Sequence, residues 1–131
     1  MFGNDRLRAL PWRDLTSRVE PLRFTHGTTR LLPGPKTLAL YLRERGFRGR
    51  PPAIDFDRRD VILIALGPRS TTGYDLHVES IVEQRRRVVV TLREQSPVLG
   101  ESGAVMTVHP FRLITIPKTG KRKFLHIEGR P

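Results

Sequence analysis

The sequence predicts an α+β domain that is mainly β, with about six or seven strands in a largely antiparallel sheet, a sandwich or a partly open barrel, and one packed helix. Three features carry this prediction. Most apolar residues fall in short runs with the period of strands, the connections between runs are short, and one segment has the period of a helix. We expect residues 1–14 to be a loosely ordered lead-in and residues 15–131 to form a single domain.

One apolar run predicts the centre of the sheet. Residues 61–66 read Val-Ile-Leu-Ile-Ala-Leu and end at Gly67 and Pro68. A strand that contacts a core on one face alternates apolar and polar residues, whereas this run has no polar position. We therefore expect a strand that is covered on both faces.

One segment has the features of a helix. Pro35 suits the first helical position, and Leu38, Tyr41 and Leu42 share one face. Gly46 suits the residue that follows a helix. Because a helix of about eleven residues is marginal alone in water, we expect its apolar face to pack on the sheet.

The other strands are predicted from shorter patterns. Pro21 limits one of them to the edge of a sheet, and Pro110 interrupts another. The alternation that begins at Tyr74 changes phase at residues 80–82, which predicts a β-bulge. These predicted strands are 18–24, 28–32, 74–82, 88–93, 105–116 and 124–127.

The loop after the central strand is the first candidate for recognition, because it offers hydrogen-bonding groups and an aromatic side chain between two buried strands. Its candidate partner-binding residues are Arg69, Ser70, Thr71, Thr72 and Tyr74. Gly73 predicts a backbone position that tolerates no Cβ, with a positive φ. The simpler alternative, which the residues alone favour, is a tight turn with Tyr74 packed inward. Loop 97–103 is a second candidate, with a flexible connection as its simpler alternative.

The chain carries a net charge of +11, from 24 basic and 13 acidic residues. Such a field attracts acidic proteins, nucleic acids and anionic membranes alike. Two basic clusters support an alternative hypothesis, a small nucleic-acid-binding protein. They are Arg85, Arg86 and Arg87 at a hairpin turn, and Lys118, Lys121, Arg122 and Lys123 nearer the end of the chain. Single-strand recognition also uses exposed aromatic side chains, whereas we expect Phe111 and Phe124 in the core.

The residues that carry chemistry do not predict an enzyme. There is no cysteine, which excludes a thiolate nucleophile, a thiolate metal site and a disulfide. The four histidines lack the close spacing of metal ligands. Asp55 and Asp57 are spaced like paired catalytic carboxylates, but the adjacent Arg58 and Arg59 favour a salt-bridged strand entry. We therefore expect no cofactor and no bound metal.

No apolar run approaches the ~18–20 residues that a membrane-spanning helix needs. The N-terminal residues also lack the apolar stretch of a signal peptide. Together with the absence of cysteine, these features favour a cytoplasmic protein, and an exported mature chain is the open alternative.

An ordered set of short motifs runs through residues 51–117. It consists of Asp55-Phe56, the strand 61–66, Thr71-Thr72-Gly73-Tyr74, Ser96-Pro97 and His109-Pro110-Phe111. In this order the motifs resemble the C-terminal domain family of PrcB, a protease-complex subunit. Thr72 departs from the family, which usually has glycine there. The resemblance implies a non-enzymatic domain that docks on, and stabilises, a protease or another larger complex, and the basic charge favours a partner with an acidic surface.

Overall fold

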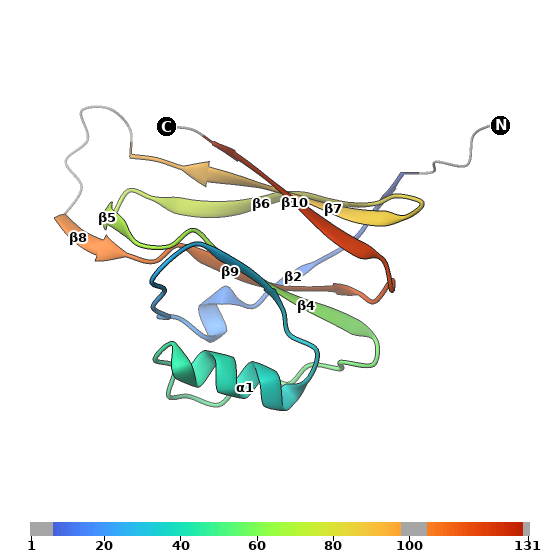
Figure 1. Cartoon of the computed structure of the whole chain (residues 1–131), viewed down its shortest axis with the longest axis horizontal. Helices are drawn as coiled ribbons and strands as arrows, with labels where there is room; N and C mark the ends of the chain where they lie inside the picture. Colours follow the sequence, from blue (N-terminus) through green and yellow to red (C-terminus); the bar gives the residue numbers. More distant parts are fainter. Residues whose placement is uncertain (1–6, 98–104, 130–131) are drawn as a thin grey trace.

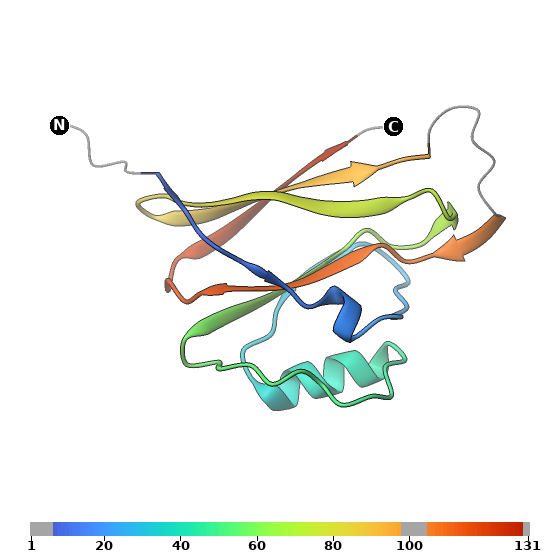
Figure 2. The ribbon, with the colours of Figure 1, turned by 180° about the vertical axis from the view of Figure 1, so that it is seen from behind.

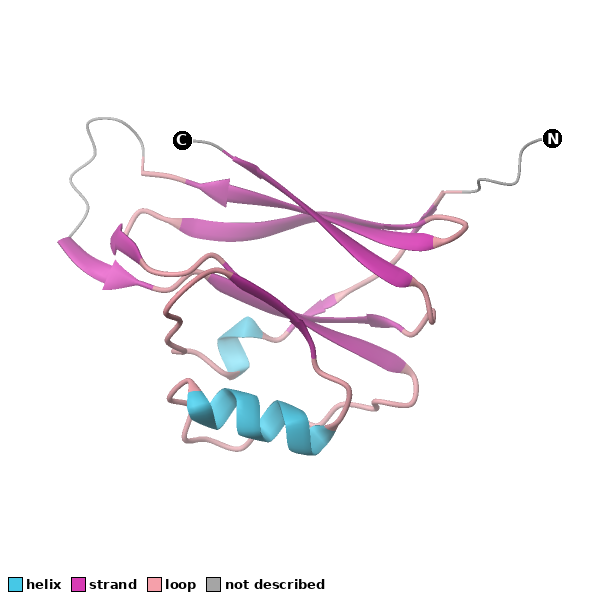
Figure 3. Ribbon diagram, in the orientation of Figure 1, coloured by secondary structure: helices cyan, strands magenta, loops and turns pink. Residues whose placement is uncertain are grey.

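Two four-stranded sheets pack face to face in the computed structural model, which describes residues 7–97 and 105–129 (Figure 1). The outer sheet has the order β1 (Arg8–Ala9), β6 (Asp75–Glu83), β7 (Arg87–Gln95), β10 (Arg122–Gly129). The central sheet has the order β2 (Arg13–Asp14), β9 (Phe111–Pro117), β4 (Arg59–Ala65), β3 (Thr28–Leu31). A two-stranded ribbon pairs β5 (Arg69–Thr71) with β8 (Val105–Val108). The α-helix α1 (Pro35–Glu44) and a short 3-10 helix, η1 (Thr16–Arg18), cover the far side of the central sheet (Figure 3).

The predicted fold class is confirmed, and the two sheets form a sandwich rather than a closed barrel. The sheets are largely antiparallel; the exception is β10, which runs parallel to β7. There are more strands than predicted because β1, β2 and β5 are short pieces and because the predicted strand 105–116 divides at Pro110. None of the helices in the described part of the chain is long and apolar enough to cross a membrane.

Strand β4 lies inside the central sheet and has a core on each face, as predicted. Val61 and Leu63 pack toward the helix layer, whereas Ile62 and Ile64 pack toward the outer sheet. All four side chains are almost completely buried. Since burying one such side chain contributes about 1.5–3 kcal/mol, this strand is a main source of stability for both layers.

Helix α1 confirms the helix prediction. Leu38, Tyr41 and Leu42 are buried against the central sheet, and Gly46 after the helix has a φ of 100°. Burial raises the pKa of the Tyr41 hydroxyl above its ordinary value. The Arg45 guanidinium lies 3.5 Å from the centre of the Tyr41 ring.

The segment 18–24 is not the predicted edge strand. After η1 the chain runs irregularly, but Val19, Leu22 and Phe24 are still buried in the core beside α1. Pro21 lacks the N–H that a strand ladder needs, so this segment buries its apolar side chains without pairing.

The N-terminal segment also differs from expectation. Residues 1–6 lie outside the described part, but Leu10 is buried between the sheets, and the short strands on either side of it join both of them. The bulge predicted at residues 80–82 is confirmed, because the register of β6 and β7 shifts between Val78 and Ser80.

Two charged contacts connect the sheets. At one end, Arg112 of β9 donates to Asp14 Oδ2 at 3.1 Å and to Asp75 Oδ1 at 3.3 Å. At the other end, Lys123 Nζ of β10 lies 2.7 Å from Asp60 Oδ2 of β4. The Lys123 side chain is only 8% exposed, so the Asp60 carboxylate takes the place of water around its ammonium group.

Replacing Asp60 by alanine should lower the free energy of unfolding by about 3 kcal/mol, because it leaves the Lys123 ammonium without its carboxylate in a buried position. Urea denaturation measures this change. Asp57→Ala is the control, since that residue lies exposed in the preceding turn. Adding Lys123→Met to Asp60→Ala should recover most of the loss. Equal effects of Asp60→Ala and Asp57→Ala would contradict the assignment.

Candidate interaction surface

The candidate loop 69–74 begins where β4 leaves the central sheet. Gly67 has a φ of 90°, and a Cβ there would lie 2.9 Å from the backbone nitrogen of Gly27. Residues 69–71 then form β5 and pair with β8, and the chain turns into β6. The loop is therefore one end of a hydrogen-bonded ribbon rather than an irregular connection.

Arg69 is bound to the outer sheet through Glu94 of β7. Its Nε donates to Glu94 Oε2 at 2.9 Å, and its Nη2 donates to Glu94 Oε1 at 3.4 Å. Its Nη1 donates to the backbone oxygen of Leu66 at 3.2 Å. The hydrogen bonds to Glu94 raise the pKa of Arg69 above its ordinary value. The guanidinium thus holds the loop in place, and most of its donors already have partners.

Gly73 is needed for a different reason from the predicted one. Its φ is not positive, so that part of the prediction is wrong. A Cβ at Gly73 would instead lie 2.6 Å from Cγ and 3.0 Å from Cα of Pro97. The expectation that a Cβ is not tolerated is therefore correct, and the cause is close packing against the chain after β7.

The other loop residues divide into two groups. Ser70 and Thr72 are exposed, whereas Tyr74 is half-buried with its ring 5.9 Å from the Arg69 guanidinium. Thr71 Oγ1 is buried and has no hydrogen-bond partner among the described residues. The loop therefore presents two hydroxyl groups and part of one aromatic ring on a fixed backbone. Loop 97–103, the second candidate, lies outside the described residues apart from Pro97.

The two basic clusters meet in the structure, which their separation in the sequence did not predict. Arg122 of β10 is paired in register with Arg87 of β7. Phe124 lies on the same face, with its ring 5.1 Å from the Arg87 guanidinium and 5.8 Å from that of Arg122. We call these three residues the Arg–Phe cluster. Arg85 and Arg86 are exposed on the adjoining turn, beside a groove of about 430 Å³.

Phe124 is 42% exposed, so its expected place in the core is wrong, whereas Phe111 is buried as expected. The reason is the register of β10. Its residues alternate between the two faces of the outer sheet, and Phe124 shares the solvent face with its neighbour Val89 rather than with the buried Val90.

Each lysine of the second basic cluster already contacts an oxygen atom of the folded chain. Lys118 Nζ donates to the backbone oxygen of Phe56 at 2.9 Å. Lys121 Nζ lies 2.9 Å from Glu83 Oε2, and Lys123 binds Asp60 as described above. Of the cluster 118–123, Arg122 is therefore the residue best placed to meet a ligand.

The candidate carboxylates and His109 form contacts that hold turns and chain segments of the fold in place. Asp55 lies 3.7 Å from Arg58 and accepts a hydrogen bond from the backbone nitrogen of Asp57, which makes a turn before β4. His109 Nδ1 accepts from the backbone nitrogen of Phe24. Within residues 7–97 and 105–129, no three acidic or histidine side chains gather in an arrangement that could hold a metal ion.

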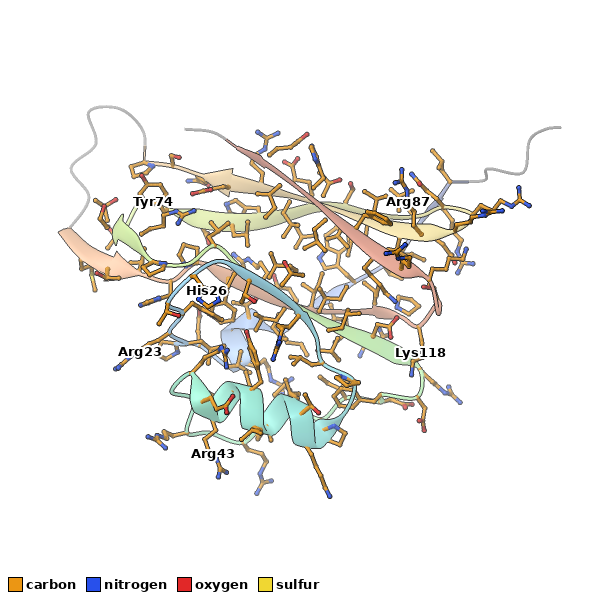
Figure 4. All side chains as sticks on the ribbon, in the orientation of Figure 1. Arg23, His26, Arg43, Tyr74, Arg87 and Lys118 are labelled. Atoms are coloured by element: carbon orange, nitrogen blue, oxygen red, sulfur yellow. The ribbon has the colours of Figure 1, made fainter. Side chains whose placement is uncertain are left out.

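The sticks in Figure 4 place Tyr74 and Arg87 toward opposite ends of the outer sheet. Strand β10 runs between these ends: Arg122 pairs with Arg87, and Gly129 pairs with Glu94, the residue that binds Arg69. The loop, the edge strand and the Arg–Phe cluster therefore form one continuous border of the molecule.

The model of the family described as PrcB C-terminal matches residues 61–117. This match confirms the resemblance to the PrcB C-terminal family over this segment. No curated protein and no solved structure matches the chain significantly. The family segment runs from β4 to the end of β9, so it contains the loop 69–74 and the hairpin of the outer sheet, whereas β10 and α1 lie outside it.

Replacing Gly73 by serine should destabilise the fold by about 1–3 kcal/mol, because any Cβ there overlaps Pro97. The midpoint of urea unfolding measures the effect. Gly34→Ser is the matched control, since a Cβ at Gly34 meets nothing within 4 Å. If both variants unfold at the same urea concentration, the packing of Gly73 against Pro97 is not as described.

Proposed function

We propose that this chain is a non-enzymatic protein-interaction domain that docks on a larger protein complex, with a protease complex as the first candidate. The observation that carries the proposal is the PrcB C-terminal match over residues 61–117. That segment includes every residue of the candidate loop. The family name links such domains to a protease-complex subunit, which is the basis for naming a protease first.

Docking would use the loop 69–74 in the form that it already has. The ion pair of Arg69 with Glu94 and the packing of Gly73 on Pro97 restrict the loop before any partner arrives. A restricted loop loses little conformational entropy on binding, so more of the contact energy appears as affinity. Ser70 and Thr72 supply exposed hydroxyl groups, and the half-buried ring of Tyr74 supplies an anchor.

The charge of the chain favours an acidic partner. A net charge of +11 speeds encounter with an acidic surface and disfavours basic ones. This effect acts on the rate of association and on the choice of partner, and the contacts at the loop determine how long the complex lasts.

A second candidate function is binding of single-stranded nucleic acid. It is favoured by the register that brings Arg87, Arg122 and the exposed Phe124 together. An aromatic ring can stack on a base while guanidinium groups contact phosphates. Arg85 and Arg86 extend the positive surface along the turn.

The two functions are separated by capture from a lysate of the source organism on the immobilised domain, with and without nuclease. The proposed function predicts that a defined protein complex containing a peptidase is retained after nuclease treatment. Tyr74→Ala should weaken its retention about tenfold, the loss expected for an aromatic anchor. Tyr74→Phe should keep most of it.

The double variant Arg85→Ala/Arg86→Ala is the matched test of the second function, and it should leave retention of the protein complex largely unchanged. Recovery of nucleic acid alone, lost with nuclease and with the double arginine variant, would overturn the docking proposal in favour of nucleic-acid binding.

A further inference from the structure

The outer sheet ends at β10, an eight-residue strand that pairs with β7 on one side. Among the described residues no strand pairs with its other side. Alternate residues of such an edge strand direct their N–H and C=O groups away from the sheet, where they can pair with another extended chain. At eight residues β10 is longer than β3, the edge strand of the central sheet on the same side of the sandwich (Figures 1 and 2).

The side chains of β10 define what could lie beside it. On the solvent face, Arg122 and Phe124 make the Arg–Phe cluster with Arg87. On the face toward the central sheet, Ile127 is 43% exposed. Leu31 of β3, which also points toward the space between the sheets, is 53% exposed. The edge therefore carries Arg122 and Phe124 on its solvent face at one end, and on its inner face the partly exposed Ile127 and Lys123, whose charge is already paired with Asp60.

The two arginines of the Arg–Phe cluster have no acidic partner among the described residues. In the described part of the chain, neither Arg87 nor Arg122 forms a salt bridge, and Arg87 Nε donates to the neutral amide of Gln84 at 2.6 Å. The acidic residue of β10, Glu128, lies 3.5 Å from Arg93 and 3.6 Å from His126. A ligand that brings carboxylates to the Arg122 end would supply the missing charge.

We propose that an extended acidic segment of the partner protein adds to β10 as a further strand of the outer sheet. Its carboxylates lie beside Arg122 and Arg87, and its alternate apolar side chains cover Ile127. Backbone hydrogen bonds hold the segment, and the alternation of acidic and apolar side chains selects it. This inference rests on the proposed docking function and names the kind of segment that docks.

A second copy of this chain is a weaker candidate for the same edge. If two β10 strands paired antiparallel about Leu125, Arg122 of one copy would lie opposite Glu128 of the other. Glu128 already lies 3.5 Å from Arg93 of its own chain, which would compete with Arg122 of the other copy for the carboxylate. Each copy also carries a net charge of +11, which opposes self-association.

The edge and the loop can be used by the same partner. The end of β10 approaches β7 closely, because a Cβ at Gly129 would lie 2.9 Å from the backbone oxygen of Glu94. Glu94 binds Arg69, so the end of the edge adjoins the loop 69–74. A segment that pairs along β10 from the Arg–Phe cluster therefore arrives at the other proposed contact.

Selection from a phage-displayed library of random linear peptides tests the inference, using the purified full chain as bait. The expected result is enrichment of peptides that alternate acidic and apolar residues. Ile127→Lys places a charge on the face of the edge strand that an added strand would cover, so it should abolish this enrichment. Leu40→Lys is the matched control on α1, where Leu40 is 59% exposed, and it should keep the enrichment.

Three results would overturn the inference. The first is enrichment that Ile127→Lys leaves unchanged. The second is selection of no alternating acidic peptide by the folded wild-type chain. The third is a dimer of the wild-type chain in analytical ultracentrifugation that Ile127→Lys dissociates, which would assign the edge to a second copy.

The capture experiment keeps the two proposals distinct. If the Ile127→Lys chain still retains the partner complex as tightly as wild type, the edge inference fails while the docking function stands. If the wild-type chain retains no protein complex, the docking function fails whatever the library selects.

Discussion

Burial of β4 on both faces is the constraint on which the rest of the structure depends. Its side chains alternate between two cores, so the chain must supply a cover for each face. The helix layer covers one face, and the outer sheet covers the other. The outer sheet itself has only one buried face. Its solvent face and its last strand, β10, are therefore left available, and Phe124, Arg87 and Arg122 lie there.

Sequence reasoning succeeded where the cause of a structure is local. The apolar run 61–66, the helix that begins at Pro35 and the phase change at Ser80 each depend on neighbouring residues, and each was predicted correctly. It failed where contacts join distant residues. The pairing of Arg122 with Arg87 and the ion pair of Arg69 with Glu94 follow from how strands pair, and neither has a signal in the spacing of the residues.

For the candidate surface, too, the residue types were predicted and the contacts between distant residues were not. The residue types of the loop 69–74 were predicted, but Arg69 proved to be a support for the loop, and Glu94, its partner, was missed. Phe124 was expected in the core because aromatic residues usually are buried, and the parallel register of β10 places it on the solvent face instead. The family segment 61–117 thus supplies the loop and the platform, while the strand that follows it completes the border of the outer sheet.

A protein partner is proposed to bind along this border, from the loop 69–74 along β10 to the Arg–Phe cluster. Amide hydrogen exchange of the chain, free and in its captured complex, measures this most directly. We expect slower exchange in the complex at residues 69–74 and in β10, with α1 unchanged. Slower exchange confined to α1 and the loops beside it would contradict this placement, because binding would then use the opposite layer of the molecule.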